Sequence, residues 1–344
     1  MALKVAINGF GRIGRLAFRR CAETGIEVVA INDLVDAKTL AYLLKYDTAH
    51  GKWNADKIGY DEETNSIIFD GRAIKVLGQP DPTKLNWKDY GAEIVLECTG
   101  RFKGKADASV HMTCGGAKGV VISAPSDKET PTFVYGVNSD ELTKEDTIIS
   151  GASCTTNCLG PVCKVLEEKF GIDAGYMTTV HAYTNDQTTL DLAKKGNLRR
   201  GRAAAANIVP TSTGAAKAIN LVIPSLKGRM QGGAIRVPVC DGSLVDLSLT
   251  LKTKGVTAEQ INAAMKEASE TTLKDVLAYT EDEIVSSDIL GETHGSIFDA
   301  TGTKVFTSPD GTELVKVVSW YDNEYSYTCQ MIRLVAHMGK VLGL

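Results

Sequence analysis

Residues 8–15 read Asn-Gly-Phe-Gly-Arg-Ile-Gly-Arg, and they join an apolar run at residues 3–8 to a segment with helical periodicity at 11–24. A second apolar run at 28–31 follows, and Asp33 closes it. A strand, a helix and a strand within about 30 residues are typical of a βαβ unit. The sequence therefore predicts that the chain begins with a parallel α/β sheet.

The glycines of this turn, Gly9, Gly11 and Gly14, have the spacing Gly-x-Gly-x-x-Gly. In a dinucleotide-binding turn, the first glycine permits the tight bend and the second lets the backbone approach a pyrophosphate. The third lets helix and strand pack closely. Asp33 would bind the adenosine ribose hydroxyls and repel a 2′-phosphate, and Leu34 offers such a phosphate no cation. We therefore expect NAD rather than NADP, and the strand–turn–helix context argues against a glycine turn without a ligand.

Strand and helix patterns keep alternating up to about residue 153. A helix is expected at 37–46, and short apolar runs lie at 67–69, 74–77, 94–98, 120–123 and 147–150. This alternation predicts the α/β class with a doubly wound, Rossmann-type parallel sheet. We expect residues 1–153 to form a dinucleotide-binding domain.

The pattern changes after residue 153 to longer runs with interspersed polar residues. Helices are expected at 154–169 and 258–268, and strands at 175–182, 233–238, 244–253, near 284 and near 315. They predict an α+β catalytic domain over 154–321 with a mixed or antiparallel sheet. The polar, Arg-rich segment 186–210 has no clear period, so we expect a functional or interface loop. The final segment, 322–344, is expected to contain an amphipathic helix.

The composition excludes several classes of protein. A formal net charge of −4 argues against a dedicated nucleic-acid binder. The eight cysteines are spread over 344 residues, unlike a secreted disulfide scaffold, and their spacing does not predict a structural zinc site. The N-terminus does not read as a secretory signal, and no apolar run is long enough to span a membrane. We expect a soluble, cytoplasmic protein with reduced thiols and without a metal.

One thiol stands apart from the other seven. Cys154 lies in Ser-Cys-Thr-Thr-Asn-Cys, residues 153–158, where a loop meets an expected helix start. A helix N-terminus and a nearby imidazolium both favour the reactive thiolate. His181, on the next expected strand, could supply that imidazole. The alternatives are a structural cysteine and a core histidine, and we assign no chemistry to Cys158.

Two further features point to bound anions. Residues 211–217 read Thr-Ser-Thr-Gly-Ala-Ala-Lys, a hydroxyl-rich turn before a helix of small residues. Such a helix start can hold an anion, although an ordinary N-cap explains it equally well. Arg236 lies within an apolar strand, where its charge needs a carboxylate or a bound anion as partner.

With these residues in place, the chain closely resembles the phosphorylating glyceraldehyde-3-phosphate dehydrogenases over nearly its whole length. The resemblance rests on residues 8–15, 45–47, 97–100, 153–158, 181–184, 213–217, 236–238 and 320–325. It implies that Cys154 attacks the aldehyde of glyceraldehyde 3-phosphate and that His181 acts as the base. A thioester would then be cleaved by inorganic phosphate, which yields 1,3-bisphosphoglycerate.

The resemblance also assigns binding residues and partners. It places the substrate's phosphate at Thr184 and Arg236, and the attacking phosphate at Ser153, Thr155, Arg200, Thr213 and Gly214. It places the NAD contacts at Gly9, Gly11, Arg12, Ile13, Gly14, Asp33, Ser123 and Asn323. It further implies a homotetramer and a C-terminal helix, within 322–344, that returns to the nucleotide-binding domain.

Alternative functions remain open at the level of sequence. One is a non-phosphorylating erythrose-4-phosphate dehydrogenase, against which the intact hydroxyl and arginine positions argue. Another is dual use of NAD and NADP, because Ala193 stands where NAD-dependent members often carry a proline. The remaining alternatives are a secondary RNA-binding role and a thiol hydrolase, and the hydrolase leaves the nucleotide fingerprint unexplained.

Overall fold

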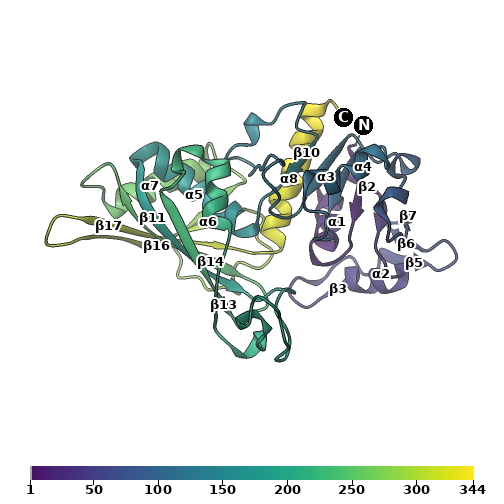
Figure 1. Ribbon diagram of the computed structural model, residues 1–344, viewed down its shortest axis with the longest axis horizontal. Coiled ribbons are helices and arrows are strands. Elements are labelled where there is room, and N and C mark those ends of the chain that lie inside the picture. Colours follow the sequence, from purple (N-terminus) through teal and green to yellow (C-terminus); the bar gives the residue numbers. More distant parts are fainter. Residues whose placement is uncertain (1) are drawn as a thin grey trace. The chain divides into compact units, whose positions relative to one another are not determined.

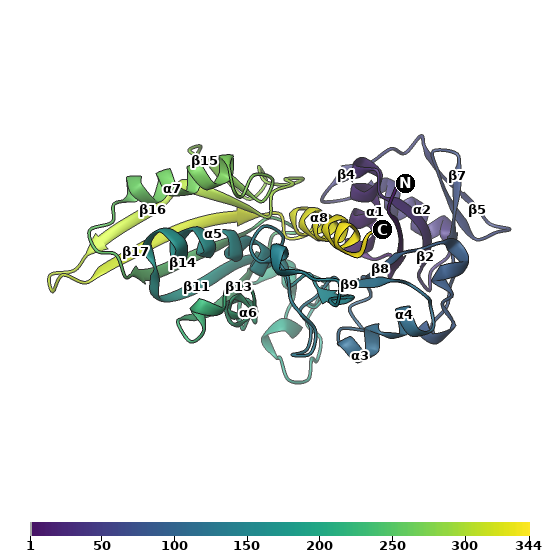
Figure 2. The same cartoon turned by 90° about the horizontal axis from the view of Figure 1, so that it is seen from above.

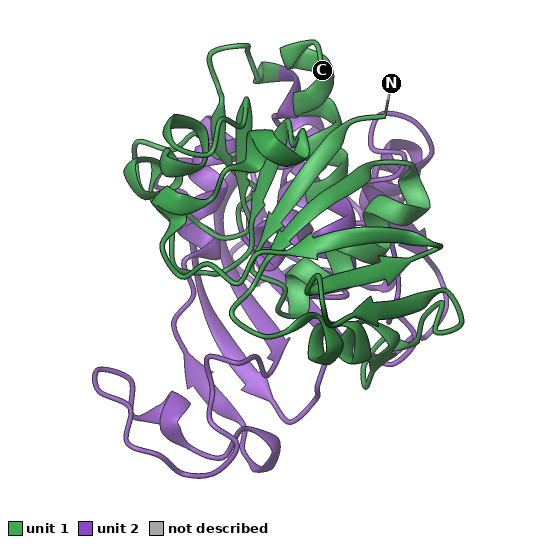
Figure 3. Ribbon diagram, turned by 90° about the vertical axis from the view of Figure 1, so that its right-hand side faces the viewer, with its two compact units in different colours: residues 1–133, 141–152, 331–344 green, residues 134–140, 153–330 purple. Residues whose placement is uncertain are grey.

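The computed structural model describes residues 2–344, which divide into two compact units (Figure 3). Among the described residues, the first unit comprises 2–133, 141–152 and 331–344, and the second comprises 134–140 and 153–330. These units follow compactness, so their limits differ from the expected domains at residues 134–140 and within the last helix.

The first unit is built on an eight-stranded sheet in the order β10-β9-β8-β1-β2-β7-β6-β5 (Figure 1). Its strands are β1 (Lys4–Asn8), β2 (Glu27–Asn32), β5 (Ile58–Asp61), β6 (Ser66–Phe69), β7 (Arg72–Val76), β8 (Ile94–Glu97), β9 (Gly119–Ile122) and β10 (Ile148–Ser150). All pairs from β10 to β7 are parallel, whereas β7, β6 and β5 pair antiparallel. β1 lies between β2 and β8, so the strand order reverses there, and ligands bind at such a reversal in open α/β sheets.

Helices and a small ribbon complete this unit. They are α1 (Arg12–Thr24), α2 (Ala37–Lys45), α3 (Lys105–Ala108) and α4 (Val110–Thr113), with the pair β3 (Tyr46–Asp47) and β4 (Gly51–Lys52). α1 ends at Gly25, which adopts a left-handed φ of 75° as a helix C-cap. The Asp36 side chain caps α2 by accepting a hydrogen bond from the Thr39 backbone N–H.

The second unit has a seven-stranded mixed sheet in the order β12-β13-β11-β14-β17-β16-β15. Its strands are β11 (Ile172–Ala182), β12 (Val209–Thr211), β13 (Met230–Val237), β14 (Ser243–Leu251), β15 (Leu277–Thr280), β16 (Ser296–Thr307) and β17 (Glu313–Tyr321). α5 (Cys154–Phe170), α6 (Ala215–Val222) and α7 (Ala258–Glu270) pack on one face of the sheet. Seen from above in Figure 2, α5 lies between α6 and α7.

The last helix, α8 (Tyr325–Leu342), contributes to both units, since the division falls between Gln330 and Met331. Its C-terminal part packs closely within the first unit. A Cβ atom added at Gly119 would lie 2.7 Å from the Met338 side chain, and one added at Gly339 would lie 2.9 Å from Leu3. Small residues at both positions are what let this helix approach the sheet.

The structure confirms the predicted α/β fold class with its parallel and mixed sheets, corrects one predicted strand and adds a strand that was not predicted. The strand expected near 284 is wrong: residues 281–295 form turns and loop, and the neighbouring strand β15 ends at Thr280. The strand β16 was not predicted at all. Its apolar pattern is interrupted by polar residues around Gly302, where the pairing with β17 is also irregular. None of the helices over residues 2–344 combines the length and the apolarity that crossing a membrane would require.

Candidate active site

The three glycines of the turn in the first unit have two different roles, since two are required by the fold and one leaves space for a ligand. Gly9 adopts a φ of 93°, and a Cβ there would lie 2.7 Å from the Thr99 backbone nitrogen. A Cβ at Gly14 would lie 2.1 Å from the Gly9 carbonyl oxygen, whereas one at Gly11 would meet nothing within 4 Å. Gly9 and Gly14 are therefore required by the fold, and Gly11 leaves open space through which a ligand can approach the backbone.

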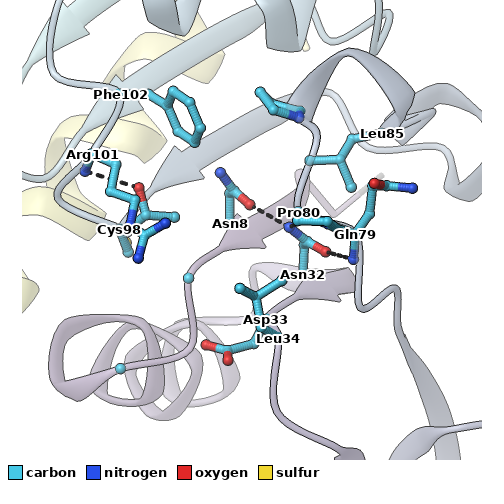
Figure 4. A pocket seen from close by; sticks show the side chains of 14 residues that line it. Asn8, Asn32, Asp33, Leu34, Gln79, Pro80, Leu85, Cys98, Arg101 and Phe102 are labelled. Carbon is cyan, nitrogen blue, oxygen red and sulfur yellow. Dashed lines mark hydrogen bonds between the residues drawn. The ribbon is translucent and has the colours of Figure 1, made fainter.

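A cavity of about 270 Å³ lies beside this turn, at the carboxyl ends of β1, β2 and β8 (Figure 4). Asn8 and Asn32 form its polar floor, with 2.8 Å between Asn8 Oδ1 and Asn32 Nδ2, and Gln79 donates its backbone N–H to Asn32. Below the floor, the buried Glu97 carboxylate accepts a hydrogen bond from Asn8 and contacts His111 Nε2 at 3.0 Å. His111 is fully buried.

Asp33 lies at the end of β2 and lines the cavity. Its carboxylate accepts hydrogen bonds from the backbone N–H groups of Phe10, at 2.7 Å, and Val35, at 3.1 Å, so it is tied to the glycine turn. Leu34 beside it is 62% exposed. This arrangement fits a ribose with free hydroxyls and gives a 2′-phosphate a negative neighbour.

The remaining predicted cofactor residues of this unit lie around the same strand ends. Arg12 and Ile13 form the first turn of α1, and Arg12 is paired with Asp47. Burial acts to raise the pKa of Asp47, but the Arg12 guanidinium and the His50 backbone N–H outweigh it and lower the pKa to about 2. Ser123 follows β9 and donates its backbone N–H to the Glu97 carbonyl oxygen at 3.0 Å.

In the second unit, Cys154 is the first residue of α5, and the Ser153 hydroxyl caps the helix by accepting the Thr156 backbone N–H at 3.1 Å. Cys154 Sγ lies 3.4 Å from His181 Nε2. His181 Nδ1 lies 2.7 Å from the Ala182 carbonyl oxygen, which can only accept, so Nδ1 carries the proton. The lone pair of Nε2 therefore faces the thiol and can accept its proton.

Burial dominates the titration of both groups. It raises the pKa of the Cys154 thiol to about 11, although Arg236 and the Thr155 hydroxyl and N–H act to lower it. It lowers the pKa of His181 to about 3, and the Arg236 charge acts in the same direction. Transfer of the proton from Sγ to Nε2 creates a thiolate and an imidazolium together, and their mutual attraction offsets part of the cost of burying either charge.

Tyr321, at the end of β17, packs against the Cys154–His181 pair and helps to position it. Its ring packs edge-on against the His181 ring, with 5.8 Å between centroids. Its hydroxyl lies 2.8 Å from both Thr155 Oγ1 and Thr179 Oγ1. The Thr155 hydroxyl is thus held in the interior by Tyr321.

Two arginines stand near this pair. Arg236 on β13 is in register with His181 on β11, and its Nη1 donates to Ala182 O at 3.0 Å and to Thr184 Oγ1 at 2.9 Å. Its Nε is buried without a hydrogen-bond partner among residues 2–344. Arg200 Nε donates to Thr211 Oγ1 at 3.0 Å, and its Nη2 donates to the Ser212 carbonyl oxygen at 3.1 Å. The loop at 186–210 is therefore anchored to the turn before α6.

The remaining predicted residues of the second unit lie at element ends. Thr213 accepts the Ala215 backbone N–H at 3.1 Å, and Gly214 is the N-cap of α6. Asn323 follows β17, and its Oδ1 accepts bonds from the Gly242 backbone N–H at 3.2 Å and the Ser243 hydroxyl at 2.6 Å. Asn323 Nδ2 is buried and lacks a partner in the described chain, so the site holds a fixed donor available to a ligand.

The structure also contains a residue that the sequence reasoning missed. Asp186 is paired with Arg200 and lies 3.9 Å from Arg236 Nη1. It is the carboxylate that an arginine within an apolar strand requires. The sequence indicates that Arg236 needs a partner of opposite charge. It does not identify Asp186 as that partner, because this depends on how the loop after β11 folds back.

Comparison with known proteins gives consistent similarities along the chain. Residues 3–105 match the family described as glyceraldehyde 3-phosphate dehydrogenase, NAD binding domain, and residues 153–323 match its C-terminal domain. The chain is 55% identical to a glyceraldehyde-3-phosphate dehydrogenase of Clostridium pasteurianum, covering 98% of this chain and 99% of the relative. It is 54% identical to that of Clostridium acetobutylicum (98% and 99% covered) and 53% identical to that of Streptococcus pyogenes (99% of each).

Proposed function

Because the chain belongs to the glyceraldehyde-3-phosphate dehydrogenase family, we propose that Cys154 is the nucleophile and His181 the base of its reaction. The chain is an NAD-dependent oxidoreductase that acts on glyceraldehyde 3-phosphate and inorganic phosphate. The observation that carries the residue assignment is the 3.4 Å contact between Cys154 Sγ and the unprotonated Nε2 of His181.

The steps follow from these two groups. Sγ bonds to the aldehyde carbon, while His181 relays the thiol proton to the aldehyde oxygen, which gives a thiohemiacetal on Cys154. His181 Nε2 then accepts the hydroxyl proton as the C–H bond breaks, and a thioester remains. NAD supplies the chemistry of hydride acceptance when it is bound. An oxygen of inorganic phosphate next attacks the thioester carbon, the C–S bond breaks, and Sγ leaves as a thiolate beside the His181 imidazolium.

The binding assignments have support in both units. For NAD we propose the glycine turn with Arg12, Ile13, Asp33 and Ser123, and the Asn323 Nδ2 donor for the nicotinamide amide. For the substrate's phosphate we propose Thr184 and Arg236, whose buried Nε lacks a partner in residues 2–344. For the attacking phosphate we propose Ser153, Thr155, Arg200, Thr213 and Gly214, at the starts of α5 and α6 and in the loop anchored to them. Helix starts offer N–H groups that suit such anions.

We further propose a cytoplasmic homotetramer, with a nucleotide-binding domain of residues 1–153 and 322–344 and a catalytic domain of residues 154–321. The long loop at 186–210 exposes Leu190, Leu192 and Leu198, which are 76%, 67% and 82% exposed. Exposed leucines clustered on one loop are typical of a surface that a neighbouring subunit covers. Analytical ultracentrifugation tests the proposed assembly.

The reaction is tested by measuring NADH with and without phosphate. Without phosphate we expect one NADH per active site in a rapid burst, because the thioester accumulates. Phosphate should then restore steady turnover. Turnover that proceeds equally without phosphate would contradict the phosphorylating reaction and indicate hydrolysis of the thioester. The erythrose 4-phosphate alternative is not favoured by the similarities above.

A further inference from the structure

Asp186 contacts residues that belong to both proposed phosphate sites. Its Oδ1 accepts the Thr184 hydroxyl at 2.5 Å and lies 3.9 Å from Arg236 Nη1. Its Oδ2 is paired with Arg200 Nη1. Thr184 and Arg236 are assigned to the substrate's phosphate and Arg200 to the attacking phosphate, so a single carboxylate stands at the junction of the two sites.

The Asp186 carboxylate already contacts both guanidinium groups, Arg200 through Oδ2 and Arg236 through Oδ1. The other bonds of Arg200 go to Thr211 and Ser212, and Arg236 Nη1 is shared between Ala182 and Thr184. These bonds hold both guanidinium groups in place without help from Asp186. A phosphate that binds these arginines therefore competes with the negative charge of Asp186.

We propose that Asp186 is a resident counter-ion of the two phosphate sites, which neutralises their arginines when the sites are empty and weakens the binding of phosphate groups. This inference rests on the proposed function, because that function assigns Arg236 and Arg200 to phosphates. In this role Asp186 acts through the two arginines and forms no bond to the reacting carbon.

The state of the Asp186 carboxylate agrees with this role. Burial acts to raise its pKa, but the Thr184 hydroxyl and the charges of Arg236 and Arg200 outweigh it, so the pKa is lowered and the group is negative at neutral pH. Its side chain is 36% exposed, so it can turn toward solvent when a phosphate arrives. Arginine–carboxylate pairs are strong where the guanidinium is buried, and they compete directly with phosphate for the same donors.

The consequence concerns product release. The product carries a phosphate at each end, and both must leave arginine-containing sites. Uniformly tight binding of substrate and product does not raise turnover, because it deepens the bound state without lowering the barrier. A carboxylate that replaces each departing phosphate keeps the arginines paired and favours release.

The test compares Asp186→Asn with Asp191→Asn. Asp191 lies on the same loop and pairs with the exposed Arg202 at 2.8 Å, so the control removes an equal charge away from the proposed phosphate residues. Isothermal titration with inorganic sulfate measures anion affinity without catalysis. A unit charge about 4–5 Å away is worth about 1 kcal/mol even in water, so we expect sulfate to bind about fivefold tighter to Asp186→Asn. Asp191→Asn should bind sulfate as the wild type does.

Kinetics provide the second measurement. We expect Asp186→Asn to lower KM for glyceraldehyde 3-phosphate and to strengthen inhibition by the bisphosphate product, and Asp186→Glu to restore both toward the wild type. Sulfate binding that is unchanged or weaker in Asp186→Asn would overturn the counter-ion proposal. Tighter sulfate binding in a protein that shows no phosphate-dependent turnover would support it while overturning the proposed function.

Discussion

At the scale of single residues, burial disfavours the charged form of both Cys154 and His181. Their contact favours the thiolate and the imidazolium when the two form together. The base in contact with the thiol is His181, whose Nε2 lies 3.4 Å from Sγ. The proposed reactivity of this cysteine rests on that ring nitrogen. Substitution can remove the thiol and the base separately.

Cys154→Ser is expected to lose at least about 10³-fold in oxidation rate, because a serine hydroxyl is a far weaker nucleophile than a thiolate and yields no thioester. NAD binding, measured by titration of tryptophan fluorescence, should persist. Cys158→Ser is the matched control. Cys158 Sγ is buried against Ser296 and Ser319, so this variant should keep its turnover. Oxidation that survives in Cys154→Ser would contradict the assignment of the nucleophile.

His181→Asn is expected to change how thiol alkylation depends on pH. Burial raises the Cys154 pKa to about 11 even though Arg236 and Thr155 act to lower it, so without an imidazole the thiol is protonated at neutral pH. Alkylation by iodoacetamide should then be slow at pH 7 and rise steadily through the alkaline range. The wild type should react measurably at pH 7, because Nε2 accepts the proton. Identical pH profiles would show that another group activates the thiol.

At this scale the sequence predicted the residues whose chemistry is local. Cys154 could be proposed from the sequence because polar residues flank it at a helix start, and His181 because it follows on the next strand. Asp186 could not be found, because its partners Arg200 and Arg236 are brought to it by the folding of a loop and by a strand about 50 residues away.

At the scale of elements, the turn between β1 and α1 contains one glycine that folding requires, Gly14, and one that we assign to ligand binding, Gly11. Gly14→Ala would place a methyl group 2.1 Å from the Gly9 carbonyl oxygen, so we expect it to lower the melting temperature of the protein without cofactor and to impair NAD binding. Gly11→Ala meets nothing within 4 Å and should melt as the wild type does while binding NAD more weakly. Calorimetry of both variants, with and without NAD, provides the measurement. Equal melting temperatures for the two variants would contradict this division of roles.

Elements with a clear period were predicted, and those with interrupted patterns were not. β14 alternates buried and partly exposed residues along its length, so its period of two can be read directly. β16 mixes fully buried residues with an exposed segment, and its pairing with β17 shifts between Asp299 and Lys304. The register of β16 depends on its pairing with β17, and the local sequence pattern carries no information about that pairing.

At the scale of the whole molecule, NAD is expected to stabilise the folded state because it binds that state alone. At a concentration 100 times its dissociation constant, a ligand adds about 2.7 kcal/mol. Protein stripped of cofactor should therefore melt several degrees lower than protein with saturating NAD. NADP at the same concentration should raise the melting temperature less, since Asp33 faces the ribose position and Leu34 offers no cation. Equal shifts with the two cofactors would indicate dual use.

The packing of α8 within the first unit has a consequence for how the protein is made. The ribosome synthesises the strands of the eight-stranded sheet early, but Met331–Leu344, which belong to the same unit, emerge last. Domains usually fold in the order of their synthesis. Here the unit that is begun first must wait, with the surface around Leu3 and Gly119 uncovered, until translation has ended. A premature stop codon in the last few positions would therefore destabilise the unit that contains the N-terminal strands. Nascent chains should depend on chaperones until the final helix is released.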